Sequence, residues 1–224
     1  MQTQFEAKQP QDQLTFRLRT LQPLPVPPVV ELRAEPEAKV RSINMVFDSP
    51  SNSYVGTIDT LPAVGTGRLE IKLTDDKNQV ESHFTSFAIR PLNTKRLAAT
   101  HSHDGQMSIF ALPSALPDQS RILVSATGEP AVPLPSGVKL IAGYYHAAVI
   151  DHPDAPLEGT VAIQLPAGRA DSTSNSYVIH WLDPSVGAWK PLKTVVQETS
   201  NQAQANSAGP GAYALTVMSS EVNK

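Results

Sequence analysis

Histidines are the residues of this chain best suited to bind a metal ion, and four of the six lie in two short groups. The first group is His101-Ser-His103-Asp104, and the second holds His146, Asp151, His152 and Asp154. In an extended strand His101 and His103 would project from the same side, which is the geometry that two imidazoles need to bind one ion. Asp104-Gly105 is also an ordinary turn signal, and Asp151-His152-Pro153-Asp154 is typical of a loop. We therefore favour solvated loops over a metal site in both places, and we predict no metal ligands.

Other reactive groups are scarce in the sequence. There is no cysteine, and no Gly-x-Ser-x-Gly elbow or outstanding pair of carboxylates. Asp75, Asp76 and Asn78 could offer oxygen atoms to calcium, but the EF-hand pattern fails and an Asx-type hairpin turn explains them better. The glycines of Gly65-Thr66-Gly67 and Gly209-Pro210-Gly211 are predicted in loops that do not bind phosphate. We therefore predict no catalytic residue, no cofactor and no enzymatic activity.

Aromatic side chains are the remaining candidates for ligand binding. Tyr144, Tyr145, Trp181 and Trp189 could stack on sugar rings if they stood on an open sheet. All four lie inside alternating segments, where large rings usually pack in the core, so we predict that the tryptophans are buried. Tyr54 lies among Ser and Asn and is predicted on the surface.

The composition indicates an all-β protein. The chain has 224 residues, of which 20 are Pro, 12 are Gly and 17% are charged, a balance that disfavours long helices. Its 18 basic and 21 acidic residues give a net charge of −3, which does not favour nucleic acid or an anionic membrane as a partner. No window resembles a membrane span of about 20 apolar residues, and the polar start lacks the apolar run of a signal peptide. We therefore expect no membrane insertion, and the chain could be a segment of a longer protein.

Alternation with period two marks the strands. In Gly67 to Thr74 the residues Leu69, Ile71 and Leu73 alternate with Arg68, Glu70 and Lys72, so one face is predicted buried and one wet. Similar rows are Leu14-Phe16-Leu18 and Ile43-Met45-Phe47. The prolines between Gln22 and Val30 predict a stiff connector or an edge.

The strand pattern divides the chain into three parts. We predict a polar N-terminal tether at 1–13, a β-sandwich at 14–92 and a second β-sandwich at 93–224, with a link near Arg90 to Thr100. The predicted strands of the second sandwich are 106–112, 121–126, 139–150, 160–165, 176–182, 189–196 and 212–217. The polar segments 170–176 and 201–210 are predicted as exposed loops.

Turn residues fix two hairpins. The first joins Leu69–Leu73 to Val80–Ile89 through a turn that contains Asp75 and Asn78. In the second, a four-residue loop from Pro184 to Gly187 would pair Leu182 with Trp189 and Ile179 with Leu192. Tyr177, Ile179 and Trp181 would then share one face, and Trp189 would pack on the other with Leu182 and Val178.

Two segments resemble known families. Gly67-Arg-Leu-Glu-Ile-Lys-Leu-Thr-Asp75, followed by Asn78, resembles the closing hairpin of bacterial immunoglobulin-like or fibronectin-like modules. The order Gly143-Tyr144, Thr160 to Pro166, Tyr177 to Asp183, Trp189 to Leu192 and Gly211 to Leu215 resembles ZU5-like β-sandwich modules. These modules occur in the non-catalytic regions of large bacterial surface and secreted proteins. The resemblance implies an interaction or spacer role outside the cytoplasm, with no self-cleavage.

Together these features predict two tandem antiparallel β-sandwich domains of the immunoglobulin-like type. We expect a non-catalytic structural or interaction module of an exported or cell-surface bacterial protein, which binds a protein or a glycan at the cell surface. Two alternatives are a carbohydrate-binding accessory module of a secreted enzyme and a metal-dependent hydrolase that uses His101, His103 and His152. The sequence does not indicate an oligomeric state.

Overall fold

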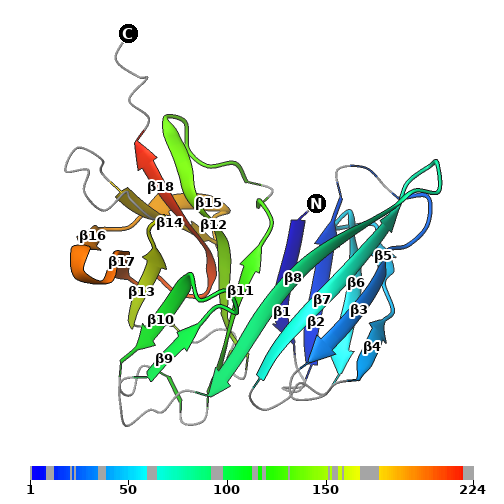
Figure 1. Ribbon diagram of the computed structural model, residues 1–224, viewed down its shortest axis with the longest axis horizontal. Helices are drawn as coiled ribbons and strands as arrows, with labels where there is room; N and C mark the ends of the chain where they lie inside the picture. The colour runs from blue at the N-terminus through cyan, green and yellow to red at the C-terminus, as the bar shows by residue number, and fades with distance from the viewer. Residues whose placement is uncertain are drawn as a thin grey trace.

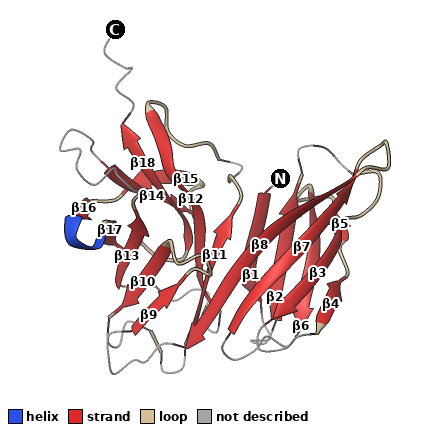
Figure 2. Ribbon diagram, in the orientation of Figure 1, coloured by secondary structure: helices blue, strands red, loops and turns tan. Residues whose placement is uncertain are grey.

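The computed structural model describes residues 2–8, 13–20, 22, 24–34, 39–59, 65–91, 98–112, 116–117, 120–130, 132–150, 152, 156–157, 159–166 and 177–218. Within these ranges the regular structure is β-strand, with one 3-10 turn at Glu198–Ser200 as the exception (Figure 2). The predicted all-β class is confirmed. It follows from the period-two patterns, since alternating residues point to opposite faces of a strand and can bury one face.

The described strands form three antiparallel sheets (Figure 1). In order across the sheet, the four-stranded sheet contains β1 (Gln2–Lys8), β2 (Gln13–Arg19), β6 (Ser53–Asp59) and β5 (Val46–Asp48). The five-stranded sheet contains, in the same sense, β16 (Thr194–Gln197), β17 (Gln202–Asn206), β13 (Gly159–Gln164), β10 (Met107–Ala111) and β9 (Ala98–His101). The nine-stranded sheet runs from β15 (Ala188–Pro191) through β14 (Tyr177–Asp183), β18 (Gly211–Met218), β12 (Val138–Val149), β11 (Arg121–Thr127), β8 (Val80–Pro91), β7 (Gly65–Thr74) and β3 (Val29–Ala34) to β4 (Val40–Ile43).

The first hydrophobic core lies between the four-stranded sheet and one end of the nine-stranded sheet. The predicted row Leu14, Phe16 and Leu18 is fully buried there, opposite Leu69 and Ile71. The row from Ile43 to Phe47 is predicted as one alternating strand, and the structure contradicts this. β4 ends at Ile43 in the nine-stranded sheet and β5 begins at Val46 in the four-stranded sheet, so the chain changes sheet between them. Ile43 and Met45 are buried in the first core, whereas Phe47 on the edge strand β5 keeps 41% of its surface exposed.

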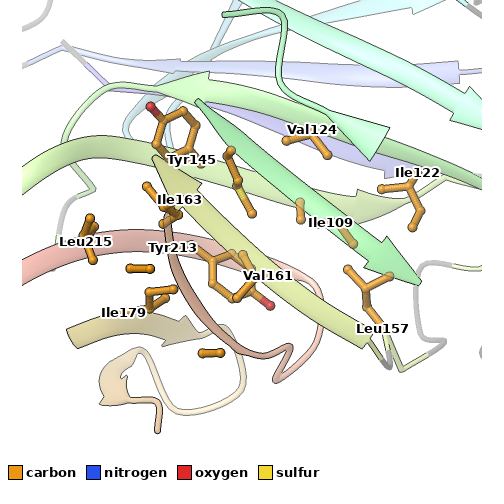
Figure 3. Packing of buried hydrophobic residues seen from close by; sticks show 14 of the residues in the cluster. Ile109, Ile122, Val124, Tyr145, Leu157, Val161, Ile163, Ile179, Tyr213 and Leu215 are labelled. Carbon is orange, nitrogen blue, oxygen red and sulfur yellow. The ribbon is translucent and has the colours of Figure 1, made fainter. Parts of the chain in front are cut away.

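The second hydrophobic core lies between the five-stranded sheet and the other end of the nine-stranded sheet (Figure 3). Its fully buried members include Ile109, Val161, Ile179, Tyr213 and Leu215, which come from both sheets. Two sheets that face each other across aliphatic and ring side chains form a sandwich, as the sequence predicts.

One strand contributes to both cores. On β11, Leu123 belongs to the first core, whereas its neighbours Ile122 and Val124 belong to the second. Consecutive side chains of a strand point to opposite faces, so the two smaller sheets cover opposite faces of the nine-stranded sheet. The sheet continues from the first half of the chain into the second because β8 pairs with β11, with Leu123 opposite Ile89. This pairing crosses the predicted division between residues 92 and 93, and those two residues lie outside the described ranges.

Both predicted hairpins are confirmed. β7 and β8 pair from Thr74 and Val80 onward, and β14 and β15 place Leu182 opposite Trp189. The amide of Leu192 donates to the carbonyl of Ile179 at 2.8 Å, which completes the predicted register.

Four sequence predictions are corrected by the structure. Residues 2–8, predicted as a tether, form β1 and pair with β2 along their whole length. The predicted loop 201–210 contains β17, in which Ala203 and Ala205 are buried against β13, because the Gln-Ala-Gln-Ala alternation is of period two although weakly hydrophobic. The predicted strand 189–196 is interrupted between β15 and β16. Tyr54 is buried in the first core, where its hydroxyl accepts a hydrogen bond from the amide of Leu24 at 3.1 Å. The predicted loop 170–176 lies outside the described residues.

Candidate functional site

One part of the nine-stranded sheet carries a cluster of charged side chains on a face that points away from the first core. The side of β3, β7 and β8 that points away from the first core is called the outer face. Its residues alternate with buried ones and are Glu31, Arg33, Arg68, Glu70, Lys72, Ser82, Phe84 and Ser86. The five-stranded sheet covers the same side of the nine-stranded sheet at its other end, over β11 and β12. No described element covers the outer face, on which Arg33, Arg68, Ser82 and Phe84 are exposed.

The strand register arranges the charges of the outer face in rows. Glu31 lies directly opposite Glu70, and both carboxylates approach the ammonium of Lys72, at 3.2 and 3.8 Å. In the next row Arg33 lies directly opposite Arg68. Among the described residues no hydrogen bond or ion pair engages either guanidinium group. Both acids of this face thus pair with Lys72, and its three cations outnumber its two carboxylates, which leaves an excess of one positive charge.

Phe84 provides an exposed aromatic surface beside these arginines. Its side chain is 53% exposed, and the guanidinium carbon of Arg68 lies 4.1 Å from the centre of its ring. This is the distance of a cation–π contact, which holds the planar guanidinium group over the ring while its N–H edges stay free.

Two cavities are lined by both Arg68 and Phe84. The smaller, of about 220 Å³, is lined by both residues with Arg33 and Glu70. The pairing of β8 with β11 ends at Phe87 and Ser125, and the two strands diverge beyond it (Figure 1). The larger cavity, of about 400 Å³, is lined by residues of both strands near this point. It is lined by Thr3, Arg68, His83, Phe84, Thr85, Ser86, His103, Ala126, Thr127 and Gly128. None of these described lining residues is acidic, so the larger cavity presents positive and hydroxyl groups.

A third cavity, of about 230 Å³, contains His146 and lies on the opposite side of the nine-stranded sheet. Burial lowers the pKa of His146 to about 4, so the imidazole is neutral at pH 7. Among the described residues no hydrogen bond reaches its buried Nδ1 atom or the buried hydroxyl of Ser125, which lies directly opposite it on β11. The ring lies deep in the protein yet keeps some accessible surface, because it faces the cavity.

The predicted pair His101 and His103 does not share a strand face. β9 ends at His101, whose Nδ1 lies 2.7 Å from the hydroxyl of Ser108. The next residues turn, with the amide of Gly105 donating to the carbonyl of Ser102 at 2.9 Å. The Asp104-Gly105 turn signal therefore describes this segment correctly, and His103 reaches the larger cavity instead.

The second histidine group is only partly described. His146 and His152 lie within the described residues, whereas Asp151 and Asp154 lie outside them. Among the residues that the structure describes, no three His, Asp or Glu side chains gather in a way that could hold a metal ion.

The acidic turn at Asp75 is an Asx turn, as predicted. One carboxylate oxygen of Asp75 accepts hydrogen bonds from the amides of Lys77 and Gln79, both at 2.8 Å. Asn78 adopts a left-handed conformation with φ of 59°. The oxygen of Asp75 thus stabilises the chain reversal between β7 and β8.

The four aromatic residues predicted as alternatives for sugar binding pack against the protein. Tyr144, Tyr145 and Trp189 are buried, and Trp181 is half-buried against the second core. The indole N–H of Trp189 donates to the carbonyl of Val132 at 2.9 Å, and that of Trp181 donates to the carbonyl of Pro210 at 3.2 Å. The prediction of a core role is confirmed for Trp189, and Trp181 lies at the margin of the core.

Sequence reasoning does not single out Arg33, Arg68 and Phe84. The strand pattern identifies Arg68 only as a solvent-facing residue. One signal is present in the sequence, because alternation places the ring of Phe84 on the same side of its strand as Ser82 and Ser86. The opposition of Arg33 and Arg68 depends on the pairing of β3 with β7, which the sequence pattern does not specify.

Comparison with known proteins adds no family to this description. No protein-family model, curated protein or solved structure matches the chain. Among the described residues there is no helix of the length and apolar character needed to cross a membrane.

Proposed function

We propose that this chain is a non-catalytic structural or interaction module in which one continuous sheet holds two β-sandwiches at a fixed angle. The observation that supports this most is the position of β11, whose Leu123 packs in the first core and whose Ile122 and Val124 pack in the second. A strand packed tightly on both faces resists bending, because its side chains would have to leave two close-packed interiors.

The biological setting is part of the same proposal. The immunoglobulin-like and ZU5-like resemblances suggest a place in an exported or cell-surface bacterial protein, outside the cytoplasm. A protein or glycan at the cell surface would be the partner, and a module of fixed shape would present its exposed faces to that partner in a constant orientation.

Spin-label distances test the fixed angle. The chain has no cysteine, so labels can be attached at Val80→Cys on the first sandwich and Val186→Cys on the second, two sites that are each 62% exposed. We expect a single narrow distance distribution. The control is the pair Val186→Cys and Val195→Cys within the second sandwich, whose distribution should be equally narrow. A cross-sandwich distribution that is broad or has several maxima would contradict the proposal.

A carbohydrate-binding accessory module is the second candidate, and one observation favours it. Phe84 is an exposed ring that lines two cavities, whereas Trp189 and Tyr145 are buried. A sugar-binding role would therefore reside on the outer face. The metal-dependent hydrolase receives no support from the described positions of His101, His103 and His152, and we do not propose it.

A further inference from the structure

Arg33 and Arg68 lie directly opposite each other, and neither forms an ion pair with a described residue, which is an unusual arrangement on a sheet of a protein with net negative charge. Guanidinium groups stay charged at all accessible pH values, and like charges directly opposite on neighbouring strands destabilise a sheet. Among the described residues Glu31 and Glu70 form ion pairs with Lys72 and not with Arg33 or Arg68, although Glu70 lines the smaller cavity beside both arginines. With three cations against two carboxylates, one positive charge of the face is left in excess, and the carboxylates offset the repulsion between Arg33 and Arg68 only in part. An anionic ligand between the two guanidinium groups would relieve it.

We propose that the outer face binds an acidic polysaccharide, with the carboxylate of a uronic sugar held between Arg33 and Arg68 and the sugar chain extending past Phe84 into the larger cavity. This inference rests on the proposed interaction role, in its carbohydrate-binding form, and names the class of ligand.

The geometry of Arg68 suits a carboxylate. Stacking on Phe84 fixes the plane of the guanidinium group and leaves its N–H edges free to form two parallel hydrogen bonds. Little side-chain entropy is then lost on binding, because the protein already holds the group in place.

The surroundings suit a sugar ring. Sugars carry both apolar C–H faces and hydroxyl groups, and the larger cavity combines the ring of Phe84 with the side chains of Ser86, Thr127 and His103. Its volume of about 400 Å³ falls in the range of small-molecule sites. Both cavities share Arg68 and Phe84, so a chain of sugars could pass from one to the other.

The charge density does not suit nucleic acid. Each strand of a DNA duplex carries a phosphate about every 3.4 Å along the helix axis, and a protein that binds nucleic acid needs a run of cations to match such a chain of charges. The outer face offers three cations next to two glutamates, an excess of one positive charge, within a chain of net charge −3. A polysaccharide with one carboxylate per one or two sugars matches that sparser pattern.

Calorimetric titration of the full chain tests the site with three probes. These are a glucuronate-containing octasaccharide, the same octasaccharide with its carboxyl groups reduced to alcohols, and a single-stranded oligothymidylate of eight nucleotides. We expect binding of the first probe, at least about tenfold weaker binding of the second, and none of the third.

Variants locate the site. Arg33→Gln and Arg68→Gln should each weaken binding of the acidic octasaccharide about tenfold or more. Arg68→Lys should weaken it as well, because lysine keeps the charge and loses the planar fork. Lys193→Gln, an exposed cation of the second sandwich, is the matched control and should bind like the wild type. The unfolding midpoints of Arg33→Gln and Arg68→Gln should not fall, since each removes one partner of a repulsive pair.

Several results would overturn the proposal. They are failure of the wild type to bind the acidic octasaccharide, equal binding of its reduced form, tighter binding of the oligothymidylate, and an effect of Lys193→Gln as large as those of the arginine variants. The spin-label experiment is carried out without a ligand and tests the fixed angle independently. If the titration fails, the polysaccharide site is wrong, and the proposal of a module with a fixed angle is still tested by the spin-label distances.

Discussion

At the scale of single residues, the histidines have different fates that follow from their surroundings. His103 lies in an exposed turn, and His101 contacts Ser108. His146 lines a cavity, and its buried Nδ1 has no hydrogen-bond partner within the described part of the chain. An unpartnered polar atom inside a protein is costly, and the low pKa of His146 shows the same burial acting on the charged form. Stability should therefore depend on pH through this residue.

We predict that wild-type stability falls on acidification from pH 6.5 to pH 4 and that His146→Leu reduces the fall. An unfolded histidine has a pKa near 6.5, whereas that of His146 is about 4 in the folded protein. Between pH 6.5 and pH 4 this histidine is protonated in the unfolded chain and neutral in the folded chain. The free energy of unfolding therefore decreases on acidification by an amount on the order of 3 kcal/mol. His180, whose pKa burial also lowers, contributes in the same direction in both proteins.

Urea denaturation at a series of pH values measures this difference. The comparison at pH 8, where both states are neutral, gives the baseline effect of the substitution. Identical pH profiles for the two proteins would show that His146 is not responsible.

At the scale of elements, close contacts between strands depend on residues without side chains. Gly67 on β7 lies directly opposite Phe87 on β8, whose ring extends across it in the first core. A methyl group built on Gly67 would lie 2.2 Å from the ring of Phe87. This glycine, predicted in a loop, is therefore a strand residue that makes room for a core aromatic.

We predict that Gly67→Ala lowers the free energy of unfolding by about 1–3 kcal/mol, because Phe87 must leave its position in a packed core. The matched control is Gly143→Ala on β12, where the added methyl group has no neighbour within 4 Å. That variant should be as stable as the wild type or up to about 1 kcal/mol more stable. Chemical denaturation of the three proteins provides the measurement, and equal stabilities of the two variants would argue against this contact.

At the scale of the whole molecule, the shared sheet links two cores that the sequence assigns to separate domains. The four-stranded sheet covers one face at one end of the nine-stranded sheet, and the five-stranded sheet covers the other face at the other end. This stagger leaves the outer face without a cover among the described elements, and the larger cavity is lined by residues of β8 and β11 near the point where the two strands diverge. The candidate site is thus a consequence of the architecture.

The shared sheet predicts that damage to the first core is felt in the second. Both tryptophans, Trp181 and Trp189, lie in the second sandwich, so their fluorescence reports that half alone. Leu18→Ala empties a fully buried position in the first core and should cost about 2–5 kcal/mol. We expect the tryptophan fluorescence midpoint in urea to fall together with the circular dichroism midpoint. The exposed variant Val186→Ala is the control, and an unchanged fluorescence midpoint in Leu18→Ala would mean that the halves unfold independently.

Local sequence patterns are enough to predict many of the strands and the tight hairpins, because side-chain alternation and turn chemistry act over a few residues. Gly67 to Thr74, the Asp75 turn and the pairing of Leu182 with Trp189 are all of this kind. The same patterns do not predict weakly hydrophobic strands such as β1 and β17. These segments become strands through hydrogen-bonded pairing with neighbouring strands more than through their composition.

How distant strands meet is known from the folded chain alone. The pairing of β8 with β11 joins the two halves, and that of β3 with β7 sets Arg33 against Arg68. Periodicity tells which face of a strand is apolar, but it contains no information on which other strand lies beside it or in which register. The neighbour and the register of each strand depend on the packing of whole sheets around two cores. The position of every group on the outer face depends on that packing as well.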